Sequence, residues 1–186
     1  MASVERIQTE LPLDSEEKNQ TELPLGWRFV PTDQELIISY LTNKVFFRAL
    51  PAKAIKEIDA MELYSVHPKV LVESISNEPE HYFFVRDHEY FYGEINKMKR
   101  VGDGIGYWRC IGKEDPVHDA EGNLRAFKIH STYFSIIPKR MRTHWRLEVY
   151  RLVDIEPSTE DEEELHVGEW VVARITRGKD PRKQWF

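Results

Sequence analysis

The hydrophobic pattern changes its period along this chain. In the first third, Leu36, Ile37, Tyr40 and Leu41 recur at the spacing of one helical face. From His81 onward, short apolar stretches follow the two-residue period of strands and are separated by turn residues. Helices followed by strands predict an α+β domain built on a mostly antiparallel sheet.

Three segments have the features of helices. Thr32 and Glu35 form a capping-box pattern, and the helix that they begin is expected to run to about Val45. A second helix is possible at Ala52–Ile58. A proline at the first position begins a short helical turn at Pro68–Leu71.

The later part of the chain contains segments rich in β-branched and aromatic residues, which favour strands. The predicted strands are His81–Val85, Tyr90–Tyr92, Tyr107–Ile111, Phe127–Ile137, Trp145–Leu152 and Trp170–Ile175.

The pattern divides the chain into one domain and two tails. Residues 1–22 are polar and have no apolar period, which predicts a flexible tail. We place the domain at residues 23–179, with an extended lead-in at its start and an acidic loop at residues 154–168. Residues 180–186 then form a C-terminal tail.

Composition narrows the class of protein. A single cysteine, Cys110, excludes an intramolecular disulfide, and the sequence shows neither a signal peptide nor a stretch long enough to span a membrane. The net charge of −6 disfavours nucleic acid at first sight, but residues 23–153 carry 19 basic and 17 acidic residues. Because phosphate contact depends on local charge, this distribution permits DNA binding without requiring it.

Residues 97–115 combine clustered cations, glycines and a short apolar strand. Alternation along that strand places Trp108 and Cys110 on a face that suits the core. The opposite face carries Tyr107, Arg109, Ile111 and Lys113. A β-element can enter the major groove of DNA, where Arg pairs with guanine and an apolar group contacts the thymine methyl. We therefore hypothesise that this strand contacts DNA.

Other interpretations of the motifs were weighed against this one. The cationic segment Lys97–Arg100 is also compatible with an ordinary solvated turn. The glycines of 102–106 precede a strand, whereas a phosphate-binding glycine loop precedes a helix. Residues 119–123 hint at a calcium loop but lack its later glutamate, so a hairpin turn is predicted. We expect no catalysis, no metal and no cofactor, because the sequence lacks a nucleophile elbow and metal-ligand spacings.

Taken together, the motifs resemble the NAC domain of plant transcription factors. Leu23–Leu41, LPLGWRFVPTDQELIISYL, is similar to the signature LPPGFRFxPTDEELxxxYL, and Gly106–Gly112, GYWRCIG, is similar to GYWKATG. The other similar blocks are Ile58-Asp59 with Leu63-Tyr64, Tyr82–Phe84 with Arg86-Asp87, Trp145 with Glu148–Leu152, and Trp170–Ile175. Six motifs in the right order, from Leu23 to about Lys179, make a specific signal.

The resemblance implies a twisted antiparallel sheet flanked by a few helices, which binds double-stranded DNA as a dimer. It implies that the lead-in segments of two subunits pair and that an Arg–Glu salt bridge crosses the interface. The matching interface positions are Leu23, Pro24, Gly26, Arg28 and Glu35. The cations expected to contact phosphates are Lys97, Arg100, Arg109 and Arg142, with Lys99 and Arg140 as neighbours. Groove readout is expected from Arg109, Ile111 and Lys113.

Two functions are compatible with this sequence. The first is a nuclear, sequence-specific transcription regulator that acts as a homodimer or heterodimer, without membrane or small-molecule partners. The second is a degenerate interaction module that inhibits related transcription factors by heterodimerisation and binds little DNA itself. The second function is compatible with the sequence because two DNA-binding segments depart from the family pattern. Arg109-Cys110-Ile111 replaces the family's Lys-Ala-Thr, and Glu114-Asp115 replaces its usual Asp-Lys pair.

Overall fold

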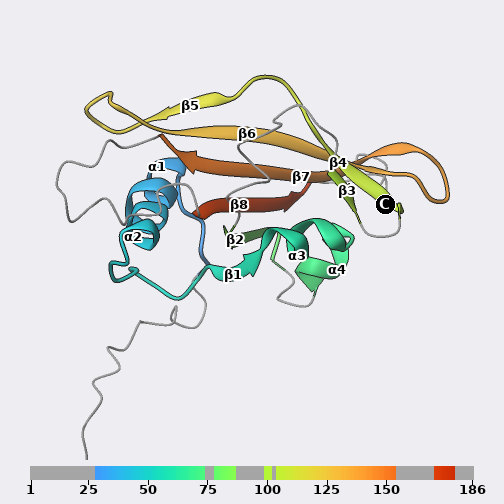
Figure 1. Cartoon of the computed structure of the whole chain (residues 1–186), viewed down its shortest axis with the longest axis horizontal. Coiled ribbons are helices and arrows are strands. Elements are labelled where there is room, and N and C mark those ends of the chain that lie inside the picture. Colours follow the sequence, from blue (N-terminus) through green and yellow to red (C-terminus); the bar gives the residue numbers. More distant parts are fainter. Residues whose placement is uncertain (1–27, 74–77, 87–98, 102–103, 154–169, 179–186) are drawn as a thin grey trace, which may run out of the picture.

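The computed structural model describes residues 28–73, 78–86, 99–101, 104–153 and 170–178 (Figure 1). Its centre is one sheet of eight strands. Seven of them follow in the order β1 (Lys56–Asp59), β2 (Glu80–Arg86), β8 (Trp170–Arg177), β7 (Met141–Leu152), β6 (Leu124–Ser135), β4 (Gly106–Cys110) and β3 (Lys99–Val101). The eighth, β5 (Asp115–His118), pairs with β6 along the edge that β4 also uses. Only β1 and β2 run parallel, which confirms the predicted α+β class with a mostly antiparallel sheet.

Most predicted strands are present with small changes at their ends. The segments expected around residues 81–85, 107–111, 127–137, 145–152 and 170–175 correspond to β2, β4, β6, β7 and β8. Sequence analysis missed β3 and β5, because β3 has three residues and β5 contains a proline and no apolar alternation. The predicted strand Tyr90–Tyr92 lies outside the described residues.

The predicted first helix is confirmed, and its middle turns are wider than those of an α-helix. It consists of α1 (Asp33–Glu35), the π-helical segment η1 (Leu36–Leu41) and α2 (Thr42–Val45). The capping box is complete: the amide of Glu35 donates to the Thr32 hydroxyl at 3.2 Å, and the Glu35 carboxylate accepts from the Thr32 amide at 2.8 Å. The apolar residues predicted to share one face are all buried.

The prediction of a helix at Ala52–Ile58 is wrong. The end of this segment forms β1, which pairs in parallel with β2. Seven residues have too little intrinsic helix stability to compete with this tertiary pairing. Helix α3 (Ala60–Ser65) follows directly, capped by Asp59, which accepts from the amide of Glu62 at 2.6 Å. The short helical turn begun by a proline is confirmed as α4 (Pro68–Glu73).

The sheet is buried on both faces. Along β2, Phe83 and Val85 belong to a core shared with α3 and α4, whereas Tyr82 and Phe84 belong to a second core shared with the helical segment at 33–45. A strand covered on both sides needs apolar residues at successive positions, which explains the unbroken apolar runs in β2 and β8. Among the described residues, no helix is long and apolar enough to cross a membrane.

Asp119 organises the tight turn before β6. Its carboxylate accepts from the amides of Glu121 at 3.1 Å and Asn123 at 2.8 Å, and from Arg125 Nε at 2.6 Å. Burial raises the pKa of Asp119, but the hydrogen bonds from Arg125 and Asn123 outweigh it and lower the pKa to about 2. The carboxylate is thus occupied by the chain itself, as expected for the predicted hairpin turn, and Gly122 takes the positive φ of 86° that this turn requires.

Candidate nucleic-acid interface

The described strands pair with the two edges of β4 over different lengths. The inner edge pairs with β6 along the whole strand. The outer edge pairs with β3 from Gly106 to Trp108 and no further. From Arg109 onward, none of the strands in the described ranges covers this edge. The described pairing on this side of β4 therefore stops at Trp108, next to Arg109.

The side chains of β4 alternate as predicted. Trp108 is buried in the core that faces α3 and α4, and Cys110 packs against the same core. Burial raises the pKa of the Cys110 thiol, so this group stays neutral and acts as a small packed side chain. Arg109 lies on the opposite face and is exposed to solvent.

The strand ends earlier than the predicted edge Tyr107–Lys113. The amide of Ile111 still donates to the carbonyl of His130 at 2.8 Å. Gly112 then takes a φ of 83° and turns the chain, so Lys113 lies in the exposed connection to β5 rather than on the strand. Ile111 keeps 40% of its surface exposed, which leaves an apolar group beside Arg109.

Two further predicted cations lie on the face that carries Arg109. Tyr107 stacks on Phe134 with ring centroids 5.3 Å apart, and the Arg140 guanidinium lies 5.7 Å from the Tyr107 ring centroid. Arg142 is directly opposite Phe134 in the register of β6 and β7, so it shares this face. Both arginines are exposed.

Sequence analysis missed Arg146, which the sheet places in line with Arg109. In the register, Arg109 is opposite Thr132, Thr132 is opposite Arg146, and Arg146 is opposite Thr176. These residues form one row across four strands on one face of the sheet. The sequence could have indicated part of this arrangement. Side chains alternate along a strand, so a buried Trp145 implies that Arg146 points outward.

The arginines of this face have no ion-pair partner among the described residues, although the row itself continues from Thr176 to Glu80 on β2. Arg109, Arg142 and Arg146 form no ion pair with any carboxylate in the described ranges, whereas the neighbouring row does. In that row, Arg174 Nε donates to Glu148 at 2.6 Å. One row further on, the Lys128 ammonium donates to Asp33 of α1 at 2.6 Å.

The two carboxylates that follow Gly112 are engaged by other side chains. Glu114 accepts two bonds from Arg151, at 2.8 Å and 3.2 Å. Asp115 lies 2.8 Å from His130 Nε2. Both acids thus have partners within the sheet, which reduces their repulsion of a nearby phosphate.

Comparison with known proteins identifies the family. The profile described as "No apical meristem (NAM) protein" matches residues 24–152, more than half of the chain. The chain belongs to the NAM, or NAC, family. Its NAC relatives include Protein ATAF2 of Arabidopsis thaliana, which is 35% identical over 173 residues, covering 91% of this chain and 59% of that protein.

Other NAC relatives give the same result. NAC transcription factor 29 of Arabidopsis thaliana is 33% identical, with 89% of this chain and 60% of that protein covered. NAC domain-containing protein JA2 of Solanum lycopersicum is 36% identical, and the match covers 84% of this chain and 43% of that protein. The chain thus spans between 43% and 60% of the length of these three relatives.

The positions predicted for a dimer interface lie only partly within the described residues. Arg28 is exposed and donates from Nε to Glu78 of the same chain at 2.7 Å, and Glu35 is exposed within the capping box. The remaining positions, Leu23, Pro24 and Gly26, lie outside the described residues, as does the cation Lys97. Lys99 and Arg100 belong to β3, of which the backbone alone is described.

Proposed function

We propose that this NAC chain is a sequence-specific DNA-binding transcription regulator that acts in the nucleus as a dimer. The observation that carries the proposal is a set of exposed arginines on one face of the sheet, which form no ion pair with a described carboxylate: Arg109, Arg142 and Arg146. The relatives support the same role, because one of them is named as a transcription factor. We expect no enzymatic activity and no cofactor.

The geometry matches the dimensions of DNA. A major groove about 12 Å wide admits a β-ribbon, so β4 and the residues that follow it would approach the bases. Arg109 would donate two hydrogen bonds to one guanine, and Ile111 would contact a thymine methyl. Lys113 would contribute to groove readout, and Arg140 and Arg142 would neutralise phosphates together with the cations of residues 97–100.

The test of direct readout is the Arg109→Ala variant. A duplex enriched by selection from random sequences at low salt is compared with a scrambled duplex by fluorescence anisotropy. Because Arg109 is proposed to read a base, we expect the variant to lose about 1–3 kcal/mol of discrimination between the two duplexes. The matched variant Lys99→Ala is expected to weaken both complexes equally. Unchanged discrimination in Arg109→Ala would refute the readout role.

The proposed dimer is tested at Arg28. The Arg28→Glu variant places two carboxylates together where the family's salt bridge is expected, so the dimer should dissociate in sedimentation-velocity ultracentrifugation. The double variant Arg28→Glu/Glu35→Arg should recover part of the dimer. Glu78→Gln is the control, because it removes the partner of Arg28 within the chain and leaves the proposed interface unchanged. A dimeric Arg28→Glu protein excludes this salt bridge.

A second function is favoured by the side chain of Ile111. It exposes 40% of an apolar group next to Arg109, and this group can hold the strand away from the bases. The chain would then act by forming heterodimers with related factors and inhibiting them. Co-purification with a full-length NAC relative, followed by loss of that relative's DNA binding, would select this function. Enrichment of a specific duplex by the homodimer would select the first.

A further inference from the structure

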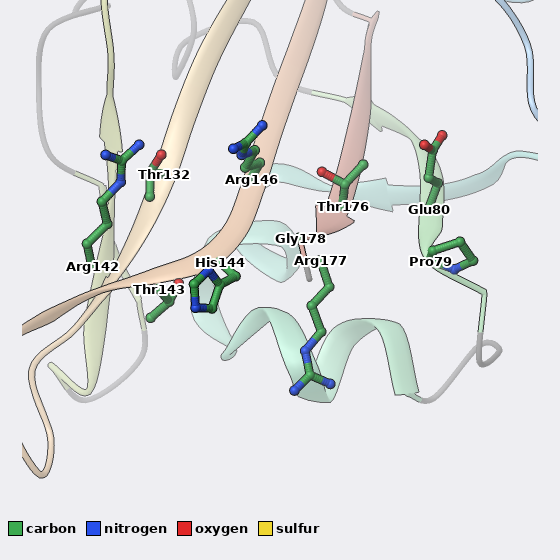
Figure 2. A pocket seen from close by; sticks show the side chains of 10 residues that line it. All are labelled: Pro79, Glu80, Thr132, Arg142, Thr143, His144, Arg146, Thr176, Arg177 and Gly178. Carbon is green, nitrogen blue, oxygen red and sulfur yellow. The ribbon is translucent and has the colours of Figure 1, made fainter. Parts of the chain in front are cut away.

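An open pocket of about 510 Å³ lies on the arginine-bearing face of the sheet, where β6, β7 and β8 run side by side (Figure 2). Its lining includes Thr132 from β6, Arg142 and Arg146 from β7, and Thr176 from β8. Figure 2 shows these four side chains pointing to the same side of the sheet, and Arg177 pointing to the other side. Guanidinium groups thus alternate with hydroxyl groups around one hollow.

The chemistry of this lining suits a phosphoryl group. Arg presents a planar fork of donors that binds two phosphate oxygens at once, and threonine hydroxyls donate to a third. One carboxylate also lines the pocket, that of Glu80, which accepts from the Tyr82 hydroxyl at 2.6 Å. Two arginines on the same face outweigh this single negative charge.

The depth of the major groove is similar to the distance from β4 to the strand that carries the pocket. Strands lie about 4.8 Å apart, so β7 is roughly 9.6 Å from β4, with β6 between them. The major groove is about 8.5 Å deep. With Arg109 of β4 at the bases, the side chains of β7 would therefore be level with the phosphates at the rim of the groove.

We propose that Arg146, with Arg142 and the hydroxyl groups of Thr132 and Thr176, binds a backbone phosphate of DNA in this pocket. The inference rests on the proposed DNA-binding function and adds to it a contact made by the face of the sheet. Arg146 binds every sequence equally, because a phosphate carries no base identity.

The test measures the salt dependence of duplex binding by the wild-type protein and by Arg146→Gln, using fluorescence anisotropy between 50 and 300 mM KCl. Loss of one phosphate contact lowers the slope of log K against log[KCl] by about 0.9 and weakens binding roughly eightfold at 0.1 M salt. Arg146→Lys keeps the charge and should recover most of the slope. Lys53→Gln is the charge-matched control, because Lys53 is exposed and lies between α2 and β1, away from the pocket.

A second measurement uses inorganic phosphate and the DNA-free protein. Phosphate should shift the NMR signals of Arg146, Thr132 and Thr176 in the wild type and leave them unchanged in Arg146→Gln. If the wild type binds DNA and Arg146→Gln has the same slope, the pocket assignment is overturned and the proposed function stands. If phosphate shifts these signals but the slope is unchanged, the pocket binds free phosphate rather than DNA, which also overturns the assignment. If the wild type binds no duplex at low salt, the proposed function itself fails.

Discussion

Replacing Gly106 with alanine is expected to destabilise the protein by about 3 kcal/mol or more, at the upper end of overpacking effects. A Cβ at this position would overlap the ring and hydroxyl of Tyr133, and it would lie 2.7 Å from the carbonyl oxygen of Phe134. Tyr133 cannot easily move, because it is fully buried and packs edge-on against Trp108 and His67. Urea unfolding, monitored by tryptophan fluorescence, would measure the decrease in the free energy of unfolding.

Two variants separate this overlap from other glycine effects. Gly122→Ala adds a methyl group in open space, so its cost is limited to about 1–2 kcal/mol for a left-handed backbone. Tyr133→Phe removes a buried hydroxyl that has no hydrogen-bond partner among the described residues, so it should be nearly neutral. In the Tyr133→Phe background, Gly106→Ala should cost less, since one overlapping atom is absent. Strict additivity of the two changes would refute steric overlap as the cause.

Replacing Asp33 with alanine is expected to lower the free energy of unfolding by about 3 kcal/mol, the lower end for breaking a buried ion pair. Asp33 opens α1 and accepts from Lys128 at 2.6 Å and from the Tyr150 hydroxyl at 2.7 Å, and Arg174 lies 3.3 Å away. Its side chain is 29% exposed, which is why the lower end applies. Alanine would leave three donors of the sheet facing a missing acceptor.

The pH dependence of stability gives an independent check on Asp33. Burial raises the pKa of Asp33, but hydrogen bonds from Lys128 and Tyr150 and the nearby positive charges outweigh it, so the pKa lies below its usual 3.8. A depressed folded-state pKa contributes stability that is complete above about pH 4 and is lost as the pH falls through the folded value. Asp33→Asn should therefore reduce stability at pH 7 and flatten the acid limb of the stability curve. An acid limb identical to that of the wild type would exclude this network as its source.

Much of the fold follows from local sequence. The elements that could not be predicted are those whose conformation is decided by tertiary pairing. The helix at 33–45 was predictable because the capping box and the apolar face agree with each other. The segment at 52–58 was not, because partner strand β2 decides its conformation. Strand β5 escaped prediction for the same reason: its four residues gain order from pairing with β6 rather than from their own pattern.

Some features of the candidate site could likewise be predicted from local sequence, and others depend on tertiary structure. The outward position of Arg109 follows from alternation next to Trp108, a property of one strand. The alignment of Arg146 with Arg109 requires the register of β4, β6 and β7, which short-range patterns do not contain. The engagement of Glu114 by Arg151 likewise depends on packing between segments 37 residues apart.

The position of β8 has a consequence for synthesis on the ribosome. The last strand of the chain sits between β2 and β7, so it joins the helical N-terminal portion to the β3–β7 portion. Until Arg177 has left the exit tunnel, β2 and β7 each have an unpaired inner edge, and unpaired edges recruit strands from other molecules. Pairing of β2 with β7 through β8 is therefore the step that removes both of these open edges.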